Sequence, residues 1–305
     1  MPTERYNHHN SLIPSFGECI YCGALANDVE LHDEHVIQFA LGGKLTILNG
    51  SCKECAKRTA DIEGELGRKV YWDFRIHTNA PTRRKKERPT ERPFLISVDN
   101  GPPEQIYAPI KDHPYFTFLP AWGVAGLLNG EQPTSEFPDA EMHIFSWQPP
   151  NMREIAGVPA GVPFQIIKPT MDINADKFAR AIAKIAYCQA IVNYGLHGFR
   201  RLMLPDLILG KYPHAPYLVG AVKADPPPRT STDIRHVVAI GETQIGSMRL
   251  LVAALRIFSN AGTDQYGAPV YHAIVGAPLA GRRLAGRRLA GRREPQLALG
   301  KGPTD

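Results

Sequence analysis

The 305-residue sequence predicts an α+β fold made of a small N-terminal unit and a larger domain. Three observations support this. Two CxxC pairs lie near the N terminus, apolar residues recur at helical spacing over one long segment, and short β-type runs between prolines and glycines fill most of the rest. Hydrophobic residues make up 43% and charged residues 21%, which is typical of a soluble globular protein. We expect four parts along the chain: an N-terminal unit at 1–77, a basic arm at 78–93, the α+β domain at 94–278 and an arginine-rich tail at 279–305.

The N-terminal unit is expected to contain an extended segment, a tight turn and a helix. Leu31 to Phe39 is extended in character, and Leu41-Gly42-Gly43 is typical of a turn. Ser51 is a suitable N-cap, and apolar residues recur at helical spacing from there to Phe74. Gly64 and Gly67 lie inside this predicted helix and weaken it.

The larger domain is expected to place helices on one face of an antiparallel sheet. Its clearest helix runs from Asn174, a suitable N-cap, to His197 and contains Cys188, which we expect to be a buried thiol. A turn at Asp99-Asn100-Gly101 follows the first strand, and no chemical motif stands out in this domain. Strands are expected at 94–98, 140–147, 162–167, 236–240, 250–258 and 270–275, the last two joined by a turn at 259–264.

Basic charge is concentrated in two segments. The tail from Leu279 to Asp305 holds six Arg and one Lys against two acidic residues, which accounts for the whole net charge of +5. Its three Leu-Ala-Gly-Arg-Arg copies have too short a period to build a core, so we expect disorder there. Between residues 83 and 92, six basic residues outnumber two acidic ones. Such a run suits a phosphate backbone, although it can also be only a solvated surface; the residues expected to contact nucleic acid are Arg83, Arg84, Lys85, Lys86 and Arg88.

The N terminus lacks the apolar core of a signal peptide, and no apolar run reaches the roughly 18–20 residues of a membrane span. We therefore expect a cytoplasmic protein with no membrane partner. In that compartment paired cysteines are more often metal ligands than disulfides.

The two CxxC pairs predict a zinc site. Cys19-Ile-Tyr-Cys22 and Cys52-Lys-Glu-Cys55 can each bring two sulfurs to about 2.3 Å from one ion. Four thiolates leave no open coordination position, so this Zn²⁺ would be structural. A redox pair or two disulfides are the alternatives, but the second pair lacks the βαβ context that a redox pair needs.

Glu34-His35, between the two pairs, has the chemistry of a hydrolytic site. A histidine can deprotonate water near neutral pH, and a carboxylate can hold a hard cation such as Mg²⁺. On a strand, His35 and Asp33 face one way and Glu34 the other. His32 and Asp33 could therefore take over either role, and the sequence leaves this choice open.

With these residues the region from about 16 to 75 resembles the HNH endonucleases, also called ββα-metal nucleases. The shared pattern is Cys19-Ile-Tyr-Cys22-Gly23, then Glu34-His35-Val36-Ile37, Gly42-Gly43 and the second CxxC. The resemblance implies a treble-clef-like hairpin and helix supported by zinc. It also implies that His35 is the general base, that Glu34 binds a catalytic Mg²⁺ or Mn²⁺, and that the substrate is nucleic acid, DNA in the first place, with no small-molecule cofactor.

Three positions depart from the family pattern. Ile47 stands where the family has a central Asn, and nearby Asn49 could orient His35 instead. Ala56 replaces the last metal ligand; Glu63, or Thr59 through a water, is the substitute that shares its helical face. Gln38 stands at a usual proline. The rival hypotheses are a catalytically inactive, zinc-stabilised nucleic-acid-binding or interaction module, and a zinc-stabilised scaffold whose larger domain carries the function.

Overall fold

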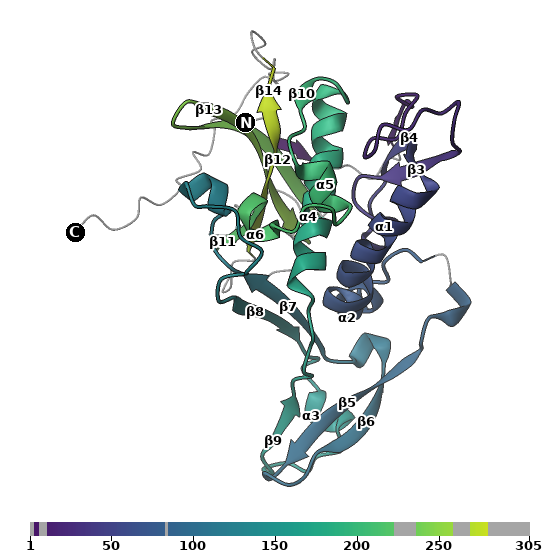
Figure 1. Ribbon diagram of the computed structural model, residues 1–305. Helices are drawn as coiled ribbons and strands as arrows, with labels where there is room; N and C mark the ends of the chain where they lie inside the picture. The colour runs from purple at the N-terminus through teal and green to yellow at the C-terminus, as the bar shows by residue number, and fades with distance from the viewer. Residues whose placement is uncertain (1–2, 6–10, 83–84, 223–235, 259–268, 280–305) are drawn as a thin grey trace, which may run out of the picture.

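The computed structural model describes residues 3–5, 11–82, 85–222, 236–258 and 269–279, and Figure 1 shows their arrangement. The predicted turn at 259–264, the repeat tail from residue 280 onward, and Arg83 and Arg84 lie outside these residues.

The N-terminal unit consists of a three-stranded sheet followed by helices. Strands pair in the order β2-β4-β3, with β3 antiparallel and β2 parallel to β4. A register shift between His32 and Glu34 marks a bulge in β3. The elements are β2 (Ser11–Ile13), β3 (Leu31–His35), η1 (Phe39–Leu41), β4 (Leu45–Cys52), α1 (Lys53–Gly64), the π-helical η2 (Glu65–Val70) and α2 (Trp72–His77).

The helix expected from Ser51 to Phe74 begins later and is interrupted. Ser51 belongs to β4, and Cys52 is the N-cap of α1. The regular α-helix ends at Gly64 and continues as a π-helical turn, a common site of local irregularity. Glycine lowers helix stability, which explains why the break falls at Gly64 and Gly67. The predicted turn is present: Gly42 adopts φ of 90°, and a Cβ on Gly43 would lie 1.8 Å from the Ile37 carbonyl oxygen.

The largest sheet belongs to the second part of the chain. Its path is β1-β12-β13-β14-β10, with β11 also pairing β14. The strands are β1 (Thr3–Arg5), β10 (Phe199–Arg200), β11 (Val219–Val222), β12 (His236–Ile245), β13 (Met248–Ile257) and β14 (Val270–Pro278). All pairings in it are antiparallel, and the strands predicted at 236–240, 250–258 and 270–275 correspond to β12, β13 and β14, with β13 ending one residue before the predicted end.

Two smaller sheets complete the second part. One has the order β6-β5-β9, and the other pairs β7 with β8. The predicted strands at 94–98, 140–147 and 162–167 correspond to β5, β8 and β9. The elements of this region are η3 (Lys85–Glu87), β5 (Glu91–Val98), β6 (Glu104–Pro109), η4 (Ile110–Asp112), β7 (Tyr115–Ala121), η5 (Gly126–Asn129), β8 (Glu141–Trp147), α3 (Met152–Ile155), β9 (Phe164–Ile167), α5 (Leu204–Ile208) and α6 (Ala215–Leu218).

The long helix α4 (Ala175–Tyr194) joins the two parts of the molecule. Asn174 caps it as expected, since its side chain accepts a hydrogen bond from the Lys177 amide at 2.9 Å. Figure 1 shows α4 between the large sheet and α1, and it packs against both. Buried side chains from residues 19–74 and 115–275 form one hydrophobic cluster around it. The α+β prediction is confirmed, whereas the domain boundaries remain a prediction.

None of the described helices combines the length and the apolar composition needed to cross a membrane.

Candidate functional site

The four paired cysteines converge. Their sulfur atoms all lie within 4.8 Å of one another, and the Cys22 and Cys52 sulfurs are 3.7 Å apart. Cys19 and Cys22 lie in a turn closed by a hydrogen bond from the Gly23 amide to the Cys19 carbonyl. Cys52 ends β4 and Cys55 lies in the first turn of α1, so the second pair spans a strand-to-helix junction.

This cluster fits a structural zinc ion. A tetrahedron with Zn–S distances of about 2.3 Å separates its sulfurs by about 3.8 Å, close to the spacing found here. All four cysteines are free, and three of them are buried. A hydrogen bond from the Cys55 thiol lowers the pKa of Cys19 to about 4, while the same contact raises the pKa of Cys55. Zinc binds cysteines as thiolates, and four of them complete a tetrahedral site without help from other side chains.

His35 is the last residue of β3 and is only partly buried. It pairs in register with Thr46 on β4, and its Nδ1 lies 2.9 Å from the Thr46 hydroxyl. Its ring also faces Phe39, at a centroid distance of 6.0 Å. The backbone N–H of Asn49 donates to Asp33 Oδ1 at 3.0 Å, and the expected contact between Asn49 and the His35 ring stays a prediction. In the structure, Thr46 therefore orients His35, and Asn49 positions Asp33.

Glu34 and Glu63 come together, but around a lysine. The Lys184 ammonium, on α4, lies 2.8 Å from Glu34 Oε1 and 2.7 Å from Glu63 Oε1, and it also donates to the His35 carbonyl. Lys184 is fully buried, and the Glu34 side chain is 7% exposed. Burial disfavours the ammonium, but the two carboxylates outweigh it and raise the pKa of Lys184 above its usual value. Burial raises the pKa of Glu63, and Lys184 partly offsets this.

This arrangement does not fit the divalent ion that the family resemblance implies. Carboxylates are suitable ligands for Mg²⁺ or Mn²⁺, and the two expected ones do share a cation. That cation is the Lys184 ammonium, which lies within hydrogen-bonding distance of both. A divalent ion could take this position only if the Lys184 ammonium moved away, because two cations in the same place would repel each other.

Two further oxygen-bearing side chains on α1, Thr59 and Asp61, are engaged elsewhere. Thr59 is buried and donates to the Ala56 carbonyl at 3.1 Å, one turn earlier on α1. Asp61 forms an ion pair with Lys177 at 2.9 Å on the exposed side.

The basic arm is described only in part. Lys85 lies in η3, although its side chain falls outside the description. Lys86 is exposed, and Arg88 is partly buried and donates to the Ala80 carbonyl. Arg83 and Arg84 are outside the described residues.

Sequence reasoning missed Lys184 and Thr46. Lys184 did carry a signal, since it interrupts the apolar stretch Ala181-Ile-Ala-Lys-Ile-Ala-Tyr-Cys188 on a helix that is otherwise buried. A lysine in such a place needs a carboxylate partner, but the sequence does not say which one. Thr46 could have been found only from the register of β3 and β4.

A model of the HNH endonuclease family matches residues 19–70. The match begins at Cys19 and ends at Val70, so it includes the four cysteines, Glu34, His35 and Glu63 but not Lys184. No curated protein and no solved structure is similar enough to the chain to count as a match. The resemblance seen in the sequence is confirmed for this segment and supports a nuclease-type function.

Proposed function

We propose that the protein is an endonuclease that hydrolyses phosphodiester bonds in DNA, with His35 as the general base. The observation that carries the proposal is the position of His35. It ends a strand of the cysteine-anchored unit that matches the HNH model, it is accessible at its edge, and a neighbouring hydroxyl orients it.

The contact with Thr46 suits a general base. A histidine that donates from Nδ1 to the Thr46 hydroxyl carries its lone pair on Nε2. That nitrogen could then accept a proton from the water that attacks phosphorus. Asp33, two residues before His35, is exposed and accepts a hydrogen bond from the backbone N–H of Asn49.

We assign no step to a divalent ion at Glu34 and Glu63, because Lys184 occupies the space between these carboxylates. Their role in the described geometry is to hold the Lys184 ammonium, which in turn fixes the backbone carbonyl of His35. Phosphate contacts by Arg83, Arg84, Lys85, Lys86 and Arg88 remain part of the proposal.

Substitution of the base tests this function. The full chain is incubated with supercoiled plasmid and with circular single-stranded DNA, in Mg²⁺, in Mn²⁺ and in EDTA. Loss of a general base typically lowers a rate by about 10²–10⁴, so His35→Ala should show no detectable cleavage. His197→Ala is the matched control, because His197 is 73% exposed and pairs only with Glu18 among the described residues. Cleavage by His35→Ala at the unmodified rate would refute the proposal, provided that both variants keep their zinc.

A second candidate is a catalytically inactive module that binds nucleic acid. The ammonium of Lys184 between Glu34 and Glu63 favours it, as does Ala56 at a ligand position of the family. This candidate predicts DNA binding without cleavage in Mg²⁺, Mn²⁺ or Ni²⁺. The same assay, with a binding measurement added, therefore separates the two functions.

A further inference from the structure

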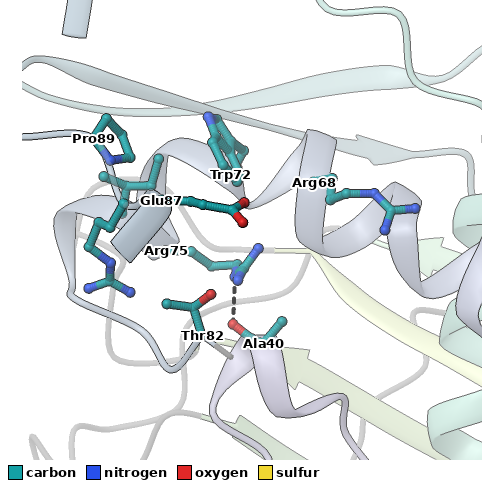
Figure 2. Close-up of a pocket in the computed structure, with 9 residues that line it drawn as sticks. Ala40, Arg68, Trp72, Arg75, Thr82, Glu87 and Pro89 are labelled. Atoms are coloured by element: carbon teal, nitrogen blue, oxygen red, sulfur yellow. Dashed lines mark hydrogen bonds between the residues drawn. The ribbon is translucent and has the colours of Figure 1, made fainter. Parts of the chain in front are cut away.

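A cavity of about 450 Å³ lies beside the basic arm, where η1, η2, α2 and η3 meet. Figure 2 shows the Trp72 ring and the Arg75 and Glu87 side chains facing this hollow. Its volume is within the range of about 300–1,000 Å³ that small-ligand sites occupy. The lining residues are Ala40, Arg68, Trp72, Arg75, Ile76, Thr82, Glu87, Arg88 and Pro89.

Arg75 is the central feature of the cavity, because it is buried without an acidic partner. It is only 9% exposed, and no described carboxylate forms an ion pair with it. Its Nε donates to the Ala40 carbonyl and its Nη1 to the Gly67 carbonyl. A guanidinium has five N–H donors, so two are used and three remain. Buried charges are normally paired, and an arginine that is pinned in place with spare donors is suited to an anion.

Neighbouring groups strengthen the positive character of this site. Burial, together with the charges of Arg88 and Arg68, lowers the pKa of Arg75, which means that each of these two charges repels that of Arg75. Glu87 offsets one of them, which leaves a net charge of +2 on the lining side chains. The Arg68 guanidinium turns away from Arg75 in Figure 2 and lies over Gly64, where a Cβ would be 2.2 Å from it. Arg88 is therefore the second arginine that we expect to contact a ligand.

An additional donor lies next to Arg75. A Cβ on Gly67 would be 3.1 Å from Gln38 Nε2 and 3.5 Å from Arg75 Nη1, so both nitrogens lie over this glycine. Gln38 is buried, and its Nε2 has no hydrogen-bond partner among the described residues. Gln38 does not itself line the cavity, so we assign it no contact with the ligand.

Trp72 identifies the class of anion. Its indole lines the same cavity and is 37% exposed, so a planar group can stack on it. A nucleotide could contact both kinds of side chain, with its phosphate on the arginines and its base stacked on the indole. A base inside a duplex has no free face, so only an unpaired nucleotide can use both.

We propose that this cavity binds one unpaired nucleotide of a nucleic-acid strand, its phosphate on Arg75 and Arg88 and its base on Trp72. The inference rests on the proposed function and narrows its substrate to nucleic acid with a single-stranded segment. The cavity is also close to the general base along the chain. Arg75 bonds the carbonyl of Ala40, and the ring of adjacent Phe39 faces the His35 ring. One strand could therefore reach both places.

Binding of 2′-deoxyadenosine 5′-monophosphate to the full chain, measured by calorimetry, tests the proposal. Inorganic phosphate and deoxyadenosine serve as the two partial probes. The nucleotide should bind saturably and more tightly than either probe. Arg88→Gln should lower the affinity for the nucleotide about tenfold or more, since a hydrogen bond to a charged group is lost. Lys111→Gln is the matched control, because it removes an exposed positive charge on η4, outside the cavity lining.

Trp72 variants separate stacking from charge. Trp72→Leu should weaken binding of the nucleotide about tenfold and leave binding of inorganic phosphate unchanged. It should also lower the affinity for single-stranded DNA but not for duplex DNA. Trp72→Phe should keep most of the affinity for the nucleotide, because phenylalanine still offers an aromatic face. Arg75→Lys keeps the positive charge but loses the planar guanidinium with its paired N–H donors. It should therefore weaken binding of both the nucleotide and inorganic phosphate. Thermal melting of each variant shows whether it is folded.

Three results would overturn the inference: no saturable binding of the nucleotide, equal affinity for nucleotide and phosphate, or the same small effect from Arg88→Gln and Lys111→Gln. None of these measurements needs cleavage, and His35→Ala should bind the nucleotide normally. Failure of this inference and failure of the proposed function are therefore distinguishable.

Discussion

Lys184 is the residue whose surroundings say most about the site. Its ammonium is buried at the junction of β3, α1 and α4, where Glu34 and Glu63 compensate its charge. A buried ion pair contributes little net stability, because desolvation offsets the attraction, but removing one partner leaves an uncompensated charge. Helical spacing predicted that Glu63 shares a face of the helix with Ala56, and the family resemblance implied that a cation binds there. The identity of that cation could not be predicted, since Lys184 is 121 positions from Glu63 in the sequence.

Lys184→Ala should lower the free energy of unfolding by about 3–5 kcal/mol at neutral pH, because the buried carboxylate of Glu34 and the partly buried one of Glu63 lose their counter-charge. The loss should depend on pH. Without Lys184 the pKa of Glu63, already raised by burial, should rise further. A carboxyl whose folded pKa is raised stabilises the folded state fully below its unfolded pKa of about 4.3, and this stability is lost as pH rises. Denaturant unfolding should therefore give a larger deficit at pH 8 than at pH 5.

The same variant tests whether Glu34 and Glu63 can bind a metal. Mn²⁺ should raise the melting temperature of Lys184→Ala and leave that of the unmodified protein unchanged. Lys177→Ala, on the same helix and 36% exposed, is the control and should show neither effect. A rise in the unmodified protein would mean that Lys184 gives way to the ion.

Among the elements, the junction of β4 and α1 controls the site, because it carries the second cysteine pair. Its helical part was predictable from periodicity, but its boundary was not. The residues from Leu45 to Cys52 form a strand whose far end serves as the helix N-cap, and Ser51 suited a cap in sequence while belonging to the strand. The helix α4 was predicted because its cap and its periodicity agree, although it ends at Tyr194, three residues before the predicted end. Strands such as β6 and β7 were missed, since their stability comes from pairing with distant residues.

Cys52→Ser should release the zinc and loosen this junction. About one zinc per chain is expected in the unmodified protein, because four sulfurs form one site. Metal analysis together with circular dichroism should show loss of zinc and of helical signal in Cys52→Ser. The fifth cysteine gives the control. Cys188 is buried on α4 and lies 3.4 Å from the Tyr21 hydroxyl, so Cys188→Ala should keep the full zinc content. Zinc retained in full by Cys52→Ser would exclude a four-cysteine site.

At the scale of the whole molecule, the N-terminal unit is built into the larger domain. Tyr187 on α4 donates to the Ile20 carbonyl at 2.5 Å, and His236 Nε2 on β12 lies 2.9 Å from the Leu41 carbonyl. Phe74 packs against Phe258 with ring centroids 4.4 Å apart. The sequence suggested a boundary between residues 77 and 94 because composition changes there. Contacts between segments so far apart leave no local trace in the sequence, so their extent became visible only in the fold.

Because the two parts share one core, residues 1–93 should not form a stable structure alone. The fragment would expose apolar side chains that now meet α4 and the large sheet, and it would leave Glu34 and Glu63 without Lys184. We expect its amide proton spectrum to lack dispersion even with zinc present, and its melting to show no cooperative transition. The matched control is residues 1–278, which lacks only the repeat tail. It should melt as the full chain does, because the tail has too little apolar surface to dock. A dispersed spectrum from 1–93, with a melting temperature close to that of the full chain, would instead make the N-terminal unit an independent domain.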